Sequence, residues 1–190
     1  MGGFTPLGEV EQHRGFRFSV HRARFRGPDG VELERDVVRH PGAVAVLPLH
    51  EDGTVTLVRQ YRAALDAWLW ELPAGVRDVA GEPDESTARR ELQEEVGLAA
   101  GRLEPLARFH NSPGFIDEDV VVFLASDLAE VGRTPHGVEE QEMEIARLPV
   151  DEVVAMVDDG RITDAKTVIG VRALVARGLD RRPPAGGDRA

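Results

Sequence analysis

The chain has 190 residues, with 23 Lys and Arg against 34 Asp and Glu for a formal net charge of −11, 42% hydrophobic residues and no cysteine. The lack of cysteine excludes disulfides, a thiolate nucleophile and Cys-ligated zinc. The acidic balance repels nucleic-acid phosphates and anionic lipids, so we expect neither nucleic-acid nor membrane binding.

The first half of the chain is predicted to be rich in β-strands. Segments 16–25 and 31–38 surround the turn-forming residues 27–30, which favours an antiparallel hairpin. A second hairpin is expected from the apolar run 43–49 and residues 55–58, and the unbroken run is typical of a strand covered on both faces. Residues 68–72 are another predicted strand.

A short helix is predicted over residues 84–96. Ala88, Leu92 and Val96 recur every four positions, and Gly97 suits the left-handed position that ends a helix. Beyond it we expect strands at 103–109, 120–125 and 143–148, and helices at 150–157 and 167–176 with Asp164 as a cap. This order is typical of an α+β fold with a mixed sheet flanked by helices.

The predicted organisation is a β arm at 1–38, one domain at 39–179 and a disordered tail at 180–190. No apolar run approaches the roughly 20 residues of a membrane span, and the start of the chain has neither the basic nor the apolar region of a secretion signal. We therefore expect a cytoplasmic protein.

The predicted helix carries three carboxylates on neighbouring positions of one face. Glu91, Glu94 and Glu95 are spaced i,i+3 and i,i+4, where like charges repel, and two of them lie in the last turn, where the helix dipole disfavours anions. A hard divalent cation relieves this repulsion, and Mg²⁺ takes a few carboxylates together with water and substrate phosphate. The spacing indicates a Mg²⁺ site, with a solvated acidic helix face as the alternative.

The same stretch resembles the Nudix box of the Nudix hydrolase superfamily. The resemblance rests on the run Arg90-Glu91-Leu92-Gln93-Glu94-Glu95-Val96-Gly97-Leu98 and on Glu82 before it. Six residues separate Gly75 from Glu82 where the family pattern has five, which affects the loop before the helix more than the carboxylate register. The resemblance implies a Nudix fold, in which helices sandwich a mixed β-sheet.

Segments outside the box look like the ADP-ribose pyrophosphatase branch. They are Arg59–Arg62, Trp70–Gly75, Ser112–Phe115, Glu139–Glu142 and Gly160–Thr167. This branch implies Mg²⁺-dependent hydrolysis of ADP-ribose to AMP and ribose 5-phosphate, with Mn²⁺ as a second possible metal, by a homodimer built through its N-terminal strands. The alternatives are hydrolysis of another nucleoside diphosphate sugar such as GDP-mannose, and a non-catalytic Nudix module that senses ADP-ribose.

The resemblance also implies roles for individual residues. The metal would be held by Glu91, Glu95, the backbone carbonyl of Ala74 and a share of Glu94. The base that accepts a proton from water would be Glu142 or Glu140, with Glu142 preferred because it adjoins the next strand, and with Glu94 as the first candidate if neither acts. Residues expected to contact substrate are Arg35, Asp36, Arg62, Gly75, Pro113 and Gly114. Residues expected to be structural are Glu82, Arg90 and Gly97.

Three of these roles have plain structural alternatives. Arg62 could pair with Glu71 instead of substrate. Pro113 and Gly114 could form an ordinary turn. Arg35 and Asp36 are unremarkable residues for the end of a strand.

Overall fold

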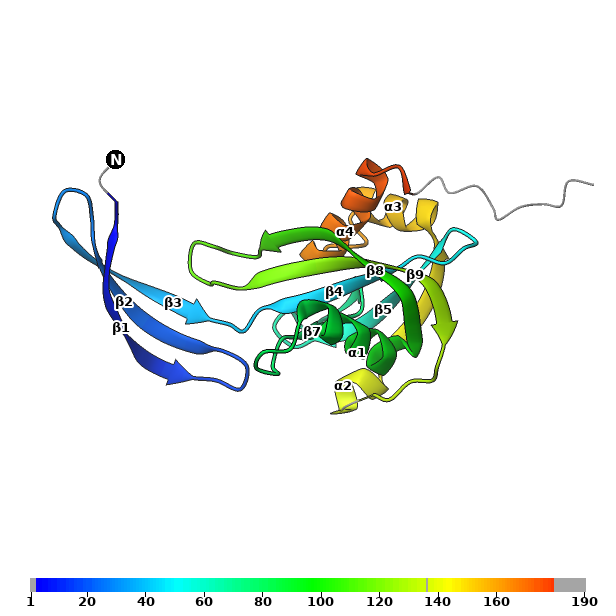
Figure 1. Cartoon of the computed structure of the whole chain (residues 1–190), viewed down its shortest axis with the longest axis horizontal. Coiled ribbons are helices and arrows are strands. Elements are labelled where there is room, and N and C mark those ends of the chain that lie inside the picture. Colours follow the sequence, from blue (N-terminus) through cyan, green and yellow to red (C-terminus); the bar gives the residue numbers. More distant parts are fainter. Residues whose placement is uncertain (1–2, 136, 180–190) are drawn as a thin grey trace, which may run out of the picture. The chain divides into compact units, whose positions relative to one another are not determined.

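The computed structural model describes residues 3–135 and 137–179, so the predicted disordered tail lies outside the described residues. The chain divides into two compact units (Figure 1). Met1–Gly42 and Phe109–Asp119 form the first, here called the arm unit. Ala43–Arg108 and Val120–Ala190 form the second, here called the core unit.

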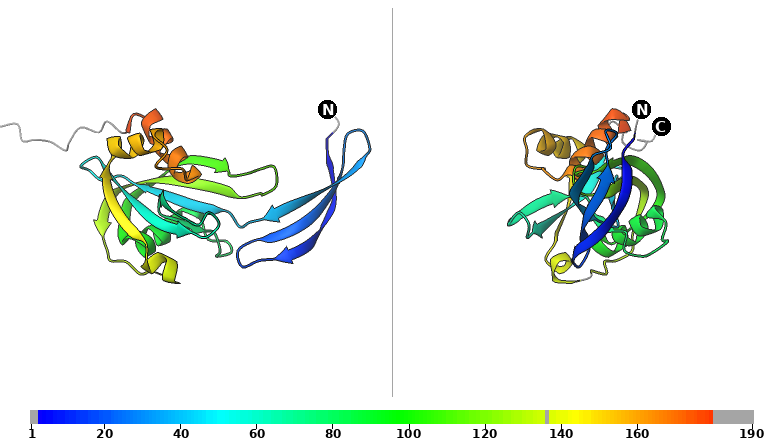
Figure 2. Two further views of the ribbon diagram at one scale, coloured as in Figure 1. Left: turned by 180° about the vertical axis from the view of Figure 1, so that it is seen from behind. Right: turned by 90° about the vertical axis from the view of Figure 1, so that its left-hand side faces the viewer.

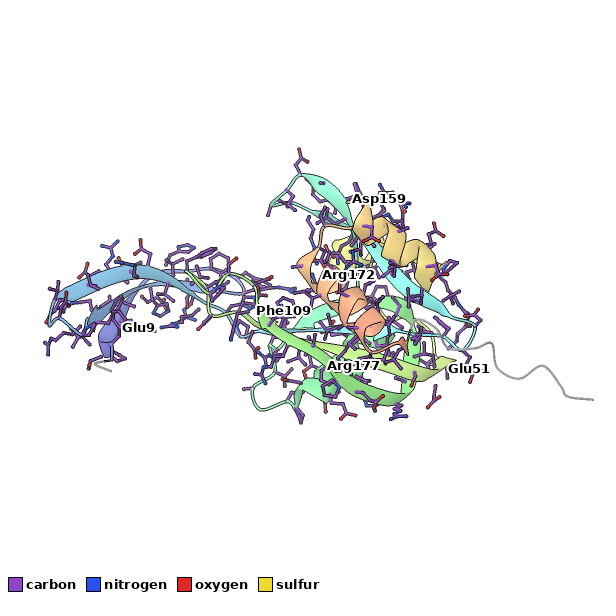
Figure 3. All side chains as sticks on the ribbon, turned by 90° about the horizontal axis from the view of Figure 1, so that it is seen from above. Glu9, Glu51, Phe109, Asp159, Arg172 and Arg177 are labelled. Carbon is purple, nitrogen blue, oxygen red and sulfur yellow. The ribbon has the colours of Figure 1, made fainter. Side chains whose placement is uncertain are left out.

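The arm unit contains a three-stranded antiparallel sheet of β1 (Thr5–Arg14), β2 (Ser19–Arg26) and β3 (Glu32–Arg39), drawn in blue in Figure 2. The predicted hairpin of the second and third strands is confirmed. The first strand was not predicted, because it is almost wholly exposed and lacks an alternating apolar pattern. Ion pairs join it to the rest of the sheet, among them the pair between Glu9 of β1, labelled in Figure 3, and Arg39 of β3.

The core unit contains two sheets. The four-stranded mixed sheet has the order β7-β4-β9-β8, with β4 parallel to β9 and antiparallel to β7. Its strands are β4 (Ala43–Pro48), β7 (Ala74–Val76), β8 (Leu98–His110) and β9 (Asp119–Glu130). The three-stranded antiparallel sheet has the order β10-β5-β6. Its strands are β5 (Thr54–Arg62), β6 (Ala67–Glu71) and β10 (Glu144–Pro149).

The predicted hairpin of 43–49 with 55–58 is wrong in its pairing. β4 and β5 form as strands, but they belong to different sheets and only the bridge between Leu49 and Val55 joins them. Both hydrogen-bonding edges of β4 are occupied, one by β7 and the other by β9. The strand is buried along its whole length, as its apolar run predicts.

Four helices complete the described part of the core unit. They are α1 (Asp84–Val96), α2 (Gly137–Gln141), α3 (Val150–Asp158) and α4 (Ala165–Ala176). The predicted bounds of α1 and its end at Gly97, where φ is 68°, are confirmed. The Asp164 cap of α4 is also confirmed, since its side chain accepts a hydrogen bond from the Thr167 backbone. The short helix α2 was not predicted, and it overlaps the acidic segment Glu139–Glu142.

Helices α1 and α4 cover opposite faces of the mixed sheet (Figures 1 and 2). Val46 on β4 and Phe123 on β9 pack in one buried cluster with Leu92 of α1. The adjacent strand residues Leu47 and Val122 point the other way, toward Gly170 of α4, because successive strand side chains alternate between faces. None of the described helices is long and apolar enough to cross a membrane.

Candidate active site

Two glutamates of α1 are buried against the short strand β7. Glu91 and Glu95 are one helical turn apart and are 8% and 4% exposed. The Ala74 backbone N–H donates to Glu95 Oε2 at 2.9 Å. A Cβ added at Gly75 would lie 1.9 Å from Glu91 Cδ, so only glycine lets this backbone approach the carboxylate.

Both buried carboxyls hold protons more tightly than usual. Burial raises the pKa of Glu91 to about 7, with the charges of Glu94 and Glu140 adding to the shift and Arg90 opposing it. Burial also raises the pKa of Glu95 to about 8, and the charges of Glu91 and Glu140 act in the same direction. The surrounding protein therefore leaves the negative charge of this pair undercompensated.

The donors at this place fit a hard divalent cation. Carboxylate and carbonyl oxygens are the ligands that Mg²⁺ prefers, and such a cation usually keeps several waters, so a few protein ligands are enough. Within 3–135 and 137–179, no group of three or more His, Asp or Glu side chains is arranged to hold a metal. The roles predicted for Glu91, Glu95, the Ala74 carbonyl and Glu94 as ligands of such a cation stay predictions.

Arg90 ties the carboxylates of α1 to the loop before the helix. Its Nη1 lies 2.8 Å from Glu91 Oε1 and 3.2 Å from Glu94 Oε2, while its Nη2 lies 3.4 Å from Glu82 Oε2. Glu82 also accepts a hydrogen bond from the Thr87 hydroxyl at 2.7 Å. These contacts brace the loop that contains the additional residue, and α1 keeps its carboxylates in register behind it.

Arg62, at the end of β5, forms a two-pronged pair with Glu71 at the end of β6. Its Nε and Nη2 lie 2.7 and 2.6 Å from the two carboxylate oxygens. Glu71 is 1% exposed, and although burial disfavours its charge, the hydrogen bonds of Arg62 and the charge of Lys166 hold its pKa below the usual range. Among the described residues, Nη1 of Arg62 has no hydrogen-bond partner, so it remains available to a ligand.

The acidic segment brings Glu140 into electrostatic contact with the buried pair. Glu140 lies in α2, its backbone carbonyl accepts a hydrogen bond from Arg133, and its charge raises the pKa of both Glu91 and Glu95. Glu142 follows α2 and is exposed. The geometry therefore gives no support to the preference for Glu142 over Glu140. Glu140 lies inside α2 and Glu142 just beyond its end, and a run of acidic residues does not reveal this difference.

Four predicted substrate residues belong to the arm unit. Arg35 on β3 donates to the Glu34 carbonyl at 2.7 Å, and Asp36 pairs with Arg22 at 3.2 Å. Pro113 and Gly114 occupy a turn closed by the hydrogen bond from Phe115 N to the Ser112 carbonyl at 3.1 Å. All four residues are exposed, and their contacts with substrate stay predictions.

The core unit also contains a residue that the sequence reasoning missed. Lys166 Nζ lies 3.0 Å from Glu71 Oε2 and 2.6 Å from Asp164 Oδ1. Burial lowers the pKa of this ammonium, but the charges of Asp164 and Glu71 outweigh that effect and the pKa is raised. The signal that could have found it is composition, because Lys166 is the only lysine among the 23 Lys and Arg residues.

Comparison with known proteins gives a consistent family. The family model described as NUDIX domain matches residues 39–169. The ADP-ribose pyrophosphatase of Mycobacterium tuberculosis (strain ATCC 25618 / H37Rv) is 42% identical, over 91% of this chain and 84% of the relative. The ADP-ribose pyrophosphatase of Bacillus subtilis (strain 168) is 37% identical, over 77% of this chain and 79% of the relative.

Two further matches bear on substrate and fold. The GDP-mannose pyrophosphatase of Yersinia enterocolitica serotype O:8 / biotype 1B (strain NCTC 13174 / 8081) is 33% identical, over 85% of this chain and 90% of the relative. A crystal structure of an ADP compounds hydrolase matches with a TM-score of 0.80 at 22% identity, covering 95% of this chain and 97% of that chain. The predicted α+β fold is confirmed by this match.

Proposed function

The chain belongs to the NUDIX domain family, and from this premise we propose that it hydrolyses the diphosphate of ADP-ribose to AMP and ribose 5-phosphate. The observation that carries the proposal is the buried pair of Glu91 and Glu95 on α1, packed against the backbone of Ala74 and Gly75. The choice of ADP-ribose is supported by the two relatives that bear the name ADP-ribose pyrophosphatase.

Nudix hydrolases use divalent metal ions, and we propose Mg²⁺ for this chain, with Mn²⁺ as the alternative. Glu91, Glu95 and the Ala74 carbonyl would hold the ion, and Arg90 would keep Glu91 and Glu94 in place. When bound, the ion offsets the negative charge of the diphosphate and of the leaving phosphate. Loading it requires both carboxyls to lose their protons, so metal affinity rises with pH through the range of their raised pKa values.

Two other side chains have roles in the proposed reaction. Glu140 accepts the proton of the attacking water, and the effect of its charge on the pKa values of Glu91 and Glu95 supports this choice. Arg62 uses its available Nη1 to bind a phosphate oxygen, while Glu71 holds the other edge of the guanidinium. Water adds across the phosphoanhydride, so each product leaves with one phosphate.

A substrate screen tests the activity. The purified chain with Mg²⁺ is given ADP-ribose, GDP-mannose, NADH, diadenosine polyphosphates and CoA in parallel, and the products are identified by phosphorus NMR. We expect the highest kcat/KM with ADP-ribose and two phosphomonoester signals from AMP and ribose 5-phosphate. Faster cleavage of GDP-mannose would move the assignment to the other nucleoside diphosphate sugars, which the GDP-mannose pyrophosphatase relative makes the second candidate.

A non-catalytic sensor of ADP-ribose is the alternative from another class of protein. Such a module would bind the nucleotide in calorimetry but release no product in the screen. The presence of all three box carboxylates, Glu91, Glu94 and Glu95, favours the enzyme. The cytoplasmic location stays a prediction from the sequence.

We further propose a homodimer formed through the arm unit. One face of its sheet is hollowed, with a volume of about 800 Å³, and is lined by Phe4, Phe25, Leu33 and Val37 together with arginines that include Arg35. A three-stranded sheet with one apolar face needs another surface to cover it, and a second copy can supply that surface symmetrically. In this dimer Arg35 and Asp36 would reach the nucleotide bound by the partner.

Truncation and sedimentation test the dimer. We expect the full chain to sediment as a dimer at micromolar concentration, and deletion of residues 1–38 to leave an inactive, poorly soluble protein. A truncated chain that is soluble, monomeric and active would contradict both the dimer and the contribution of Arg35 and Asp36 to the partner's site.

A further inference from the structure

The only lysine of the chain belongs to a largely buried polar cluster beside the proposed active site. The chain uses arginine at every other basic position, yet residue 166 is lysine. Its side chain is 14% exposed, and the two carboxylates that it contacts, Glu71 and Asp164, are 1% and 11% exposed. Buried charges persist in proteins only when they are paired and hydrogen-bonded, so this cluster must be complete to be stable.

The first half of the cluster controls the direction of Arg62. Glu71 Oε2 is shared between Arg62 Nη2 at 2.6 Å and Lys166 Nζ at 3.0 Å. Lys166 is therefore a second cationic partner of the carboxylate that binds Arg62. Because Glu71 engages Nε and Nη2 of Arg62, the orientation of this carboxylate decides where Nη1 points.

The second half of the cluster holds the backbone that leads to the proposed metal site. Asp164 accepts from Lys166 Nζ through one oxygen and from the Thr167 backbone and hydroxyl through the other, at 3.0 and 2.7 Å. The Thr167 hydroxyl oxygen in turn accepts from the Leu72 backbone N–H at 2.8 Å. Two residues later, Ala74 donates to Glu95. Two groups of hydrogen bonds, joined by the Leu72–Ala74 backbone, thus link the start of α4 to Glu95.

We propose that Lys166 is a positioning residue, which aims Arg62 at the substrate diphosphate through Glu71 and anchors the Leu72–Ala74 backbone through Asp164. The proposal rests on the hydrolytic function proposed above for the same site. An ammonium suits this place because it is a compact charge whose donors can serve two carboxylates in different directions. The larger planar guanidinium of arginine, which the chain uses elsewhere, has its donors fixed in one plane.

Steady-state kinetics with a matched control is the first test. Lys166→Met keeps the length of the side-chain stem and removes the positive charge. The control, Arg161→Met, removes a cation that pairs on the surface with Asp159, which is labelled in Figure 3. We expect Lys166→Met to lower kcat/KM for ADP-ribose by about 10–100-fold, mainly through KM, and the control to leave it unchanged. A folded Lys166→Met variant with normal kcat/KM would overturn the proposal.

A rescue experiment separates positioning from stability. Glu71→Gln added to Lys166→Met removes the carboxylate that was left with one partner, so we expect the unfolding midpoint to recover. The KM should stay high, because an amide no longer fixes Arg62 on both prongs. Recovery of the midpoint and the KM together would show a merely structural role and overturn the proposal. Lys166→Arg keeps the positive charge, so its unfolding midpoint should stay near that of the parent chain while its KM for ADP-ribose rises.

A spectroscopic test needs no substrate. Lysine labelled with ¹⁵N gives a single side-chain ammonium signal, since the chain has one lysine. We expect this signal to be visible in the folded protein and to shift in Arg62→Met, because both cations share Glu71 Oε2. The control Arg161→Met should leave it in place. An unchanged signal in Arg62→Met would overturn the proposal. If the Lys166 signal shifts in Arg62→Met but the parent chain does not hydrolyse ADP-ribose, the proposed function is refuted while the coupling of Lys166 to Arg62 through Glu71 is supported.

Discussion

The arm unit and helix α1 both carry many acidic and basic side chains, but they place them in opposite environments. In the arm, Arg24 and Glu32 pair at 2.8 Å across two strands with about half of each side chain in water. In α1, Glu91 and Glu95 are buried side by side and their pKa values are raised. Exposed pairs contribute little because water already solvates them, whereas buried like charges are costly and persist where a ligand compensates them. The density of charge is thus a poor guide to function, and uncompensated burial is a good one.

The largest effect is expected from neutralising the buried pair. Glu91→Gln or Glu95→Gln should remove nearly all hydrolysis, because the amide keeps the shape but is a poor ligand for a hard cation. Glu85→Gln on the exposed face of α1, which pairs with Arg89, is the matched control and should keep full activity. The measurement is ADP-ribose hydrolysis against Mg²⁺ concentration. Near-normal activity of either buried variant would remove the metal site from α1.

Replacing the proposed base should give the next largest effect. Glu140→Gln should lower kcat by about 10²–10⁴-fold with little change in KM, because a proton acceptor matters only in the transition state. Glu142→Gln is the control, being exposed beyond α2. Single-turnover rates against pH would decide between them. A loss confined to Glu142→Gln would assign the base to Glu142, as the sequence predicted. Normal rates in both variants would assign the base to Glu94 of the Nudix box.

The pH dependence of stability without metal should differ between the two regions. A carboxyl whose pKa is raised on folding stabilises the protein below its unfolded value and loses that contribution as pH rises through its folded value. The free energy of unfolding should therefore fall from about pH 4.5 up to about pH 7 for Glu91 and up to about pH 8 for Glu95. Each residue contributes a loss of up to about 1.4 kcal/mol per pH unit.

Urea unfolding in EDTA between pH 5 and 9 measures this loss. The variant with both glutamates changed to glutamine should show a flatter profile, and Mg²⁺ should restore the most stability at the alkaline end. Identical profiles for the variant and the parent chain would contradict the raised pKa values.

The smallest effect is expected in the arm. Glu32→Gln breaks the exposed pairs with Arg24 and Arg26, and the unfolding midpoint at physiological salt should not change measurably, because such pairs are screened. Repeating the measurement at low salt sharpens the contrast, since a small loss should then emerge. A large loss at high salt would show that Glu32 is buried in the assembled protein, as the proposed dimer would allow.

The amino-acid sequence predicts those structural features that depend on residues close to one another along the chain. The bounds of α1, its end at Gly97, the Asp164 cap and the β2–β3 hairpin were all predicted, because helical periodicity, capping and turns are local. The pairing of β4 was not, because a buried apolar strand has no preference for its neighbour in sequence when β7 and β9 offer longer-range edges.

The candidate site divides in the same way. The sequence by itself determined that Glu91, Glu94 and Glu95 share one helical face, since the repeat of about 3.6 residues per turn brings such positions together. Only the tertiary structure decided that two of them are buried against Ala74 and Gly75, because burial depends on the strand that packs on the helix.

The same holds for the contacts around Lys166. Its bond to Glu71 and the bond from Leu72 to Thr167 each join residues 95 positions apart, and no local pattern encodes such a meeting. Folding brings these residues together because α4 packs directly on the sheet at Gly170, where an added Cβ would lie 2.9 Å from the Leu72 side chain. A close approach of this kind is a property of the packed core, so it could be found only in three dimensions.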